Sequence, residues 1–201
     1  GRRDLFVTEA CEYVESFLTL KPTLALINNI DDDHLDYYEN IEAIVAAFER
    51  FLALLPEDGT FIACTDDERV KALADKSDCK VITYGLEGGD YTAADIMFDE
   101  KGNAGFTVLR RGEALGRVQL SVPGKHNIVN ALGAIAVSDQ YDVPFATQAQ
   151  ALHDFANTRR RFEYYGERNG VKVFHDYGHH PNEIRATLDA AKRVPHNRLF
   201  C

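Results

Sequence analysis

The clearest hydrophobic pattern in the chain is a helical stripe between residues 41 and 55. Its apolar members recur at intervals of three, with two adjacent pairs, and are Ile41, Ile44, Val45, Phe48, Phe51, Leu52 and Leu55. This spacing places them on one face of an amphipathic helix. Asn40 is suited to cap the start of that helix, and Pro56 and Gly59 end it. We therefore predict a helix with one face packed on a core.

Short apolar runs alternate with helical segments through the first part of the chain. We predict strands at residues 4–8, 24–30, 60–64 and 80–84, and a further helix at 68–74. Alternation of strands and helices favours a parallel sheet covered by helices. The fold class predicted from this half is therefore α/β, with a mostly parallel sheet flanked by helices.

The pattern changes after Gly88. Short runs at residues 93–98, 105–109 and 116–122 show alternating character and are separated by glycine-containing turn signals. Such runs indicate antiparallel strands, which we expect to extend the sheet. Helices are predicted at 127–140 and 146–155.

A second, shorter part follows a basic run at residues 159–161. Asn169-Gly170 lies between apolar runs and is a strong signal for a β-hairpin, because both turn positions require positive φ. Pro181 is suited to the first turn of a helix. We place a domain boundary near Asn157, which gives a first domain of residues 1–157 and the beginning of a second at 158–201.

Composition narrows the class of protein. The 201 residues are 45% hydrophobic and 27% charged, with a net charge of -10 and a pI near 5.1. This balance argues against nucleic-acid and anionic-membrane partners, which reward clustered Lys and Arg. The four cysteines show no CxxC spacing, and there is no signal peptide or membrane-length apolar run. We expect a cytoplasmic protein, and both ends of the chain look cut from a longer polypeptide.

The first candidate site is the polar segment 28–38, which follows a predicted strand and precedes the helix at 41–55. It carries Asp31, Asp32, Asp33 and His34, and Glu9 follows another predicted strand. Ligands of open α/β sheets bind at the carboxyl ends of strands, and this residue set suits a divalent cation or a cation–phosphate pair. The alternative is a solvated acidic loop in which Asp36 or Asn40 caps the next helix.

The second candidate site opens the helix predicted at 127–140. Asn127 and Asn130 are three residues apart and share a face, so their carboxamides suit the edge of an adenine ring. His126 is placed to stack on such a ring. The alternative is that Asn127 caps the helix and Asn130 is a surface residue.

The remaining candidates lie in the second part of the chain. Residues 159–161 are all Arg and suit phosphate groups, unless they form an exposed loop with one Arg paired to Glu163. Residues 175–180 (HDYGHH) hold three His and one Asp at a strand end. This cluster suits a transition metal, which makes a zinc hydrolase a separate hypothesis. Its alternative is a helix cap at Asp176 beside solvated His side chains.

Taken together, these stretches resemble the Mur ligases of peptidoglycan synthesis. The matching stretches occur in the family's order and are residues 9–13 (EACEY), 29–37 (NIDDDHLDY), 123–131 (PGKHNIVNA), 160–163 (RRFE) and 176–181 (DYGHHP). The resemblance implies a P-loop-NTPase-like central domain followed by the first hairpin and helix of a Rossmann-like C-terminal domain. The family's UDP-substrate domain and its P-loop have no counterpart in these residues. The resemblance therefore implies that this chain alone is catalytically silent and needs the rest of its polypeptide.

The resemblance also implies residue roles. Glu9 and His34 match positions that hold Mg²⁺, and with Arg161 they are the catalytic candidates. The residues implied to contact the nucleotide are His126, Asn127, Asn130, Arg161 and Asp176. Those implied to contact the incoming amino acid are Tyr177, His179 and His180. Arg161 and Asp176 match residues that reach the nucleotide when the family's domains close.

The implied reaction is amide-bond formation with ATP and Mg²⁺. ATP phosphorylates the lactyl carboxylate of UDP-N-acetylmuramate, and the amine of L-alanine attacks the resulting acyl phosphate. A second possibility within the family is a recycling ligase that attaches a whole tripeptide. A third hypothesis is non-catalytic: these 201 residues, without a P-loop, are only a folded scaffold. We apply it to this chain alone and not to the parent protein.

Overall fold

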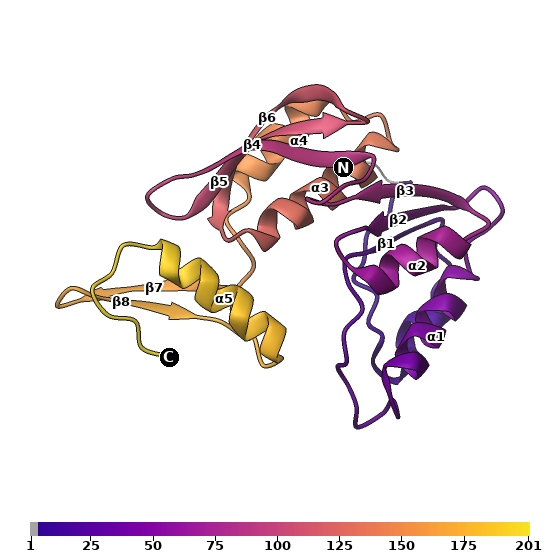
Figure 1. The fold of residues 1–201 in the computed structure, drawn as a ribbon, viewed down its shortest axis with the longest axis horizontal. Coiled ribbons are helices and arrows are strands. Elements are labelled where there is room, and N and C mark those ends of the chain that lie inside the picture. Colours follow the sequence, from indigo (N-terminus) through magenta and orange to yellow (C-terminus); the bar gives the residue numbers. More distant parts are fainter. Residues whose placement is uncertain (1–3) are drawn as a thin grey trace. The chain divides into compact units, whose positions relative to one another are not determined.

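The computed structural model describes residues 4–201 (Figure 1). The chain divides into two compact units, one ending at Ile82 and the other running from Thr83 to Cys201. A six-stranded sheet has its strands in sequence order, β1 to β6, and a separate two-stranded sheet holds β7 and β8. Pairing is parallel at the start of the large sheet and antiparallel from β4 onward. The predicted α/β fold class is confirmed.

The first unit is built on two parallel strands and their helices. Strand β1 (Leu24–Ile27) pairs in parallel with β2 (Thr60–Cys64), whose five residues are all buried. Helix α1 (Ile41–Leu52) follows β1, and α2 (Glu68–Lys76) follows β2. The complete burial of β2 is typical of a strand covered on both faces.

Helix α1 forms as its apolar stripe predicts. The Asn40 side chain accepts a hydrogen bond from the backbone N–H of Ala43 at 2.9 Å, which caps the helix start. On its buried face, the Phe51 ring stacks on Phe17 with centroids 4.7 Å apart. Phe17 belongs to the 3-10 segment η1 (Tyr13–Thr19), which the hydrophobic pattern did not reveal.

The strand predicted at residues 4–8 is wrong. These residues have no strand assignment, and the side chains of Phe6 and Val7 are each 89% exposed. A strand is stable only where a neighbour pairs with its backbone and covers its side chains. The described part of the first unit contains no strand that pairs with this run.

The second unit begins in β3 (Lys80–Tyr84), which pairs in parallel with β4 (Tyr91–Phe98). Strands β5 (Asn103–Arg110) and β6 (Glu113–Pro123) continue the sheet in antiparallel fashion. The predicted antiparallel extension is confirmed.

Two helices follow β6, namely α3 (His126–Asp139) and α4 (Phe145–Asp154). The C-terminal end of α3 is anchored to the sheet through Asp139. Its carboxylate accepts hydrogen bonds from the Tyr91 hydroxyl and from Arg110, the latter at 2.7 Å. Burial and the Asp139 carboxylate raise the pKa of Tyr91 to about 12, so this hydroxyl stays protonated as a donor. The anchor holds the helix whose first turn carries the predicted adenine residues.

The last elements are the predicted hairpin and helix. Strands β7 (Glu163–Arg168) and β8 (Val171–His175) are antiparallel, and Asn169 and Gly170 both have positive φ, at 54° and 78°. Helix α5 (Pro181–Arg193) starts with Pro in its first turn, as predicted. The Arg193 guanidinium lies 4.4 Å from the centroid of the Phe98 ring, which brings the end of α5 against β4. Across residues 4–201, no helix combines the length and apolar character needed to cross a membrane.

Candidate functional site

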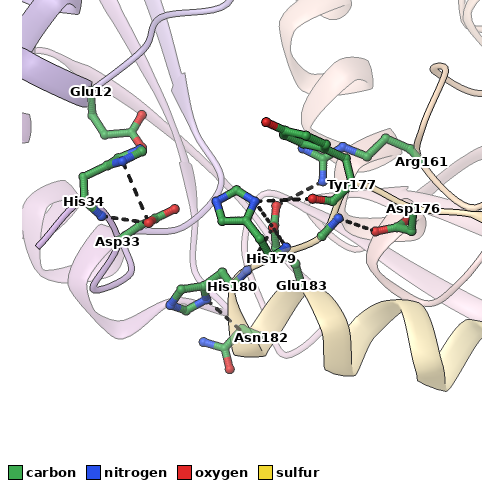
Figure 2. Close-up of polar contacts among 11 residues, drawn as sticks. Glu12, Asp33, His34, Arg161, Asp176, Tyr177, His179, His180, Asn182 and Glu183 are labelled. Carbon is green, nitrogen blue, oxygen red and sulfur yellow. Dashed lines mark hydrogen bonds and ion pairs between the residues drawn. The ribbon is translucent and has the colours of Figure 1, made fainter. Parts of the chain in front are cut away.

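In the first unit, the predicted site residue His34 lies in a cluster with carboxylates (Figure 2). Its Nε2 is 3.4 Å from Oε1 of Glu12, and its backbone N–H donates to Oδ1 of Asp33 at 2.7 Å. The ring of Tyr13 lies over the imidazole with centroids 4.7 Å apart. His34 has a φ of 58°, a left-handed conformation that few non-glycine residues adopt.

The loop around His34 is tied to the start of η1. The Tyr38 hydroxyl donates to the backbone carbonyl of Glu12 at 2.6 Å, and the Tyr13 hydroxyl donates to Asp36 at 3.0 Å. Burial, with the nearby Glu15 carboxylate, raises the pKa of Tyr38 to about 12, so the phenol remains a donor at neutral pH. The acidic loop is therefore held by specific contacts rather than only solvated.

The carboxylate nearest the His34 ring is that of Glu12, which was not among the predicted site residues. Glu9 is exposed, and the structure shows no contact between its carboxylate and His34. Glu9 and Glu12 belong to the same short motif. The motif therefore identified the region of the contact but not which of the two Glu residues contacts His34. The pairing of Glu9 with His34 stays a prediction.

The donor chemistry of this region suits a hard cation. Carboxylates at Glu9, Glu12 and residues 31–33 supply oxygen ligands, which Mg²⁺ prefers. Mg²⁺ proteins commonly use one or two carboxylates together with water and substrate phosphates, so a closed protein cage is not required. An imidazole is a less usual Mg²⁺ ligand than a carboxylate. His34 can serve as one only if a ring nitrogen with a lone pair points toward the cation.

In the second unit, the first turn of α3 carries the predicted adenine residues. The Asn127 amide donates to the Pro123 carbonyl at 2.8 Å, and the Asn130 amide donates to Oδ1 of Asn127 at 3.2 Å. The two carboxamides therefore share a face, as predicted. Lys125 occupies the cap position and makes no side-chain cap bond, so the alternative of Asn127 as a cap is wrong.

Gly124 shapes the approach to this helix. Its φ is 103°, and a Cβ added there would lie 2.6 Å from Cε1 of His126. The His126 side chain keeps an exposed edge while protein surrounds much of its ring, and this burial lowers its pKa. Asp176 acts in the opposite direction and raises the pKa, whereas Arg161 lowers it further. His126, Arg161 and Asp176 are therefore close enough for their charges to interact.

Arg161 is held by Glu183, a residue of α5 that sequence reasoning missed (Figure 2). Its Nη1 is 3.0 Å from Oε1 of Glu183. Oε2 of the same carboxylate accepts from the backbone N–H of His179 at 3.1 Å and of His180 at 3.4 Å. Burial alone would raise the pKa of Glu183, but these donors together lower it. The sequence signal that could have identified Glu183 is its position three residues after His180, which is the spacing of a capping box.

The alternative for residues 159–161 paired one Arg side chain with Glu163, and Arg161 is not that residue, because it pairs with Glu183. Instead, Glu163 accepts the backbone N–H of Arg160 at 2.7 Å. The Arg160 guanidinium lies 4.6 Å from the centroid of the Tyr177 ring, a cation–π contact. Two neighbouring arginines therefore have different partners.

Asp176 connects two backbone segments. Its carboxylate accepts from the backbone N–H of Phe162 at 2.8 Å and of Gly178 at 2.7 Å. It does not cap α5, because His180 holds that position and accepts from the N–H of Asn182 at 3.4 Å. Asp176 thereby holds the arginine run next to the segment that carries Tyr177 and His179.

The zinc hypothesis is not supported by this geometry. Ligand atoms from three of the residues His175, Asp176, His179 and His180 do not come within 4.8 Å of one another. The ring of His175 instead contacts the Tyr165 hydroxyl at 3.1 Å, and His180 acts as a helix cap. A structural or catalytic zinc needs converging ligands.

Comparison with known proteins decides the family. A family model described as Mur ligase middle domain matches residues 2–138, and one described as Mur ligase, glutamate ligase domain matches residues 160–201. The chain belongs to the Mur ligase family. These matches agree with the motifs in both parts of the chain.

Individual Mur ligases match most or all of the chain. The UDP-N-acetylmuramate–L-alanine ligase of Clostridium acetobutylicum is 47% identical over all 201 residues, which make up 44% of that protein. The crystal structure of UDP-N-acetylmuramate-alanine ligase from Thermotoga maritima is 30% identical, with a TM-score of 0.75 over 90% of this chain and 40% of that one. A murein peptide ligase from Psychrobacter arcticus is also 30% identical, with a TM-score of 0.66 over 89% of this chain and 36% of that one. The chain spans less than half the length of these Mur ligases.

Proposed function

We propose that this chain is part of an ATP-dependent ligase that joins L-alanine to UDP-N-acetylmuramate. Residues 1–157 form most of its central domain, and residues 158–201 begin its C-terminal domain. The observation that carries the proposal is 47% identity over all 201 residues to a UDP-N-acetylmuramate–L-alanine ligase. His34, Asn127, Asn130, Arg161 and Asp176 of the candidate site lie in the same motifs that define the resemblance.

The nucleotide part of the proposal uses the second unit. Asn130 offers its remaining amide capacity to the adenine edge, while Asn127 holds it in place through their 3.2 Å hydrogen bond. His126 packs on the ring. Arg161 supplies a planar cation for phosphate, and Asp176 keeps the arginine run in position through the N–H of Phe162.

The cation part uses Glu9 and His34. Mg²⁺ bound there would neutralise negative charge on the transferring phosphoryl group. We assign the amino-acid substrate to Tyr177, His179 and His180. Tyr177 is 55% exposed while its ring contacts Arg160, so it can reach a ligand and still be oriented.

The chemistry follows from the weakness of a carboxylate as an acyl donor. The lactyl carboxylate oxygen attacks the γ-phosphorus of ATP, and the bond to ADP breaks. The L-alanine amine then attacks the acyl carbon, loses a proton, and displaces inorganic phosphate. Arg161 has the charge and the donors to stabilise a phosphoryl group during the first step. We place this activity in the cytoplasm, with no nucleic-acid or membrane partner.

The test is amino-acid-dependent phosphate release by the full-length protein that contains this chain. The reaction contains ATP, Mg²⁺ and UDP-N-acetylmuramate, with either L-alanine or the tripeptide. Release with L-alanine supports the proposal. Release with the tripeptide alone would reassign the protein to recycling, which is the second candidate because a murein peptide ligase is as similar in sequence as the alanine ligase of Thermotoga maritima. No release with either substrate would refute both.

A control uses the isolated 201-residue chain under the same conditions. It contains no Gly-Lys-Thr or Gly-Lys-Ser run, so it lacks a phosphate-binding P-loop. We expect no phosphate release from it. Turnover by the isolated chain would contradict the assignment of the phosphate-binding P-loop to the rest of the polypeptide.

A further inference from the structure

The His34 side chain is oriented by two residues that the proposed reaction does not use. Glu12 lies beside one ring nitrogen, with Nε2 and Oε1 3.4 Å apart. Tyr13 covers a face of the ring, with the planes inclined by 38°. Tyr13 is the first residue of η1 and Glu12 directly precedes it, so both lie more than 20 positions before His34 in the sequence.

The backbone on both sides of this contact is also held. The His34 carbonyl accepts the N–H groups of Tyr37 and Tyr38, each at 2.9 Å. The Tyr38 hydroxyl in turn holds the Glu12 carbonyl, and Tyr38 is only 4% exposed. A left-handed residue persists only where its surroundings determine it, and these bonds do so for His34.

The two ring nitrogens of His34 have different surroundings. Nε2 faces Glu12, with Oε1 3.4 Å away, slightly beyond the usual hydrogen-bond length. Nδ1 is 3.9 Å from Oδ1 of Asp33, which is beyond hydrogen-bond length. A carboxylate that accepts N–H from one nitrogen leaves a lone pair on the other, which is the usual arrangement around metal-bound histidines.

We propose that Glu12 and Tyr13 are positioning residues that hold His34 with Nε2–H toward Glu12 and present Nδ1 to the divalent cation. The proposal rests on the proposed function, in which His34 serves the cation site. Glu12 sets which nitrogen carries the proton, and Tyr13 sets the plane of the ring. Tyr13 is itself restrained because its hydroxyl donates to Asp36 at 3.0 Å.

The test uses Mn²⁺ as a spectroscopic probe in the full-length protein with ATP. Histidine labelled with ¹⁵N at Nδ1 or at Nε2 is incorporated, and electron spin-echo measurements show which nitrogen couples to Mn²⁺. His34→Ala identifies the signal of this residue. We expect coupling from Nδ1 in the wild type. Coupling from Nε2, or no imidazole coupling at all, would overturn the proposal.

Variants of Glu12 supply the second measurement. Glu12→Ala should weaken Mn²⁺ affinity about 10- to 100-fold and reduce the Nδ1 coupling, as expected for loss of a carboxylate behind a metal-bound histidine. Glu12→Gln keeps an acceptor oxygen and should lose less. Glu39→Gln is the matched control, because Glu39 is an exposed carboxylate close in sequence that makes none of these contacts. Unchanged affinity and coupling in Glu12→Ala would refute the role of Glu12.

Variants of Tyr13 test the ring contact separately. Tyr13→Phe keeps the stacking surface and should retain the Nδ1 coupling, whereas Tyr13→Leu should broaden or reduce it. Equal coupling in the two variants would remove Tyr13 from the proposal. Phosphate release with L-alanine is recorded on the same wild-type sample, so failure of this inference and failure of the proposed function give different results.

Discussion

Glu183 contributes both to the capping of α5 and to the orientation of Arg161, and comparing two substitutions of Glu183 should separate these contributions. Glu183→Ala removes the capping-box side chain and the ion pair together. Loss of a cap costs about 1 kcal/mol, and an exposed ion pair contributes at most about 1 kcal/mol. The Glu183 and Arg161 side chains are 35% and 51% exposed, so the ion pair belongs at the low end. We expect a total loss of about 1–2 kcal/mol of unfolding free energy.

Glu183→Gln is the matched control for the capping contribution. Gln also serves at this position of a capping box, so it should keep the bonds to the backbone and lose only the charge. We expect a loss of about 0.5 kcal/mol or less. Urea unfolding of the two variants and the wild type gives both values. If Glu183→Gln is as destabilising as Glu183→Ala, the capping argument is refuted.

The pH dependence gives an independent check on Glu183. Its pKa is lowered from an ordinary value of 4.5, so its charged form is favoured in the folded state. Its contribution is therefore fully present above about pH 4.5 and is lost as the pH falls through its lower folded-state pKa. The difference in stability between Glu183→Ala and the wild type should shrink on acidification below pH 4.5. A difference that grows on acidification would contradict this sign.

Three further substitutions test other parts of the structure. Tyr38→Phe removes the 2.6 Å donor of the Glu12 carbonyl, which keeps the N–H of Glu15 at 2.9 Å, and should cost about 0.5–1.5 kcal/mol, measured by urea unfolding. Gly124→Ala places a Cβ 2.6 Å from the His126 ring at a φ of 103°. Because this displaces the ring, the KM for ATP of the full-length enzyme should rise. An unchanged KM would remove His126 from the nucleotide site. His34→Ala should abolish most phosphate release while circular dichroism and the melting temperature stay close to wild type, and normal turnover would exclude His34 from the mechanism.

Local sequence signals were sufficient where a single segment decides its own structure. The bounds of β2 and β3 match the predicted strands, and Asn40 caps α1 as expected. The Asn169-Gly170 turn follows from the conformational freedom of those two residues. The strand predicted at 4–8 failed because an apolar run becomes a strand only beside a partner, and no local pattern reports whether that partner is present.

The sequence by itself determined the α/β class, the order of most elements, and the family motifs that carry His34, Asn130, Arg161 and their neighbours. Only the tertiary structure decided which carboxylates His34 and Arg161 meet. Glu12 rather than Glu9 lies beside His34, and Glu183 rather than Glu163 pairs with Arg161, across 22 residues. Such contacts depend on where separate elements pack against one another. Spacing along the chain specifies the face of an element, but it does not specify the neighbour that the face will meet.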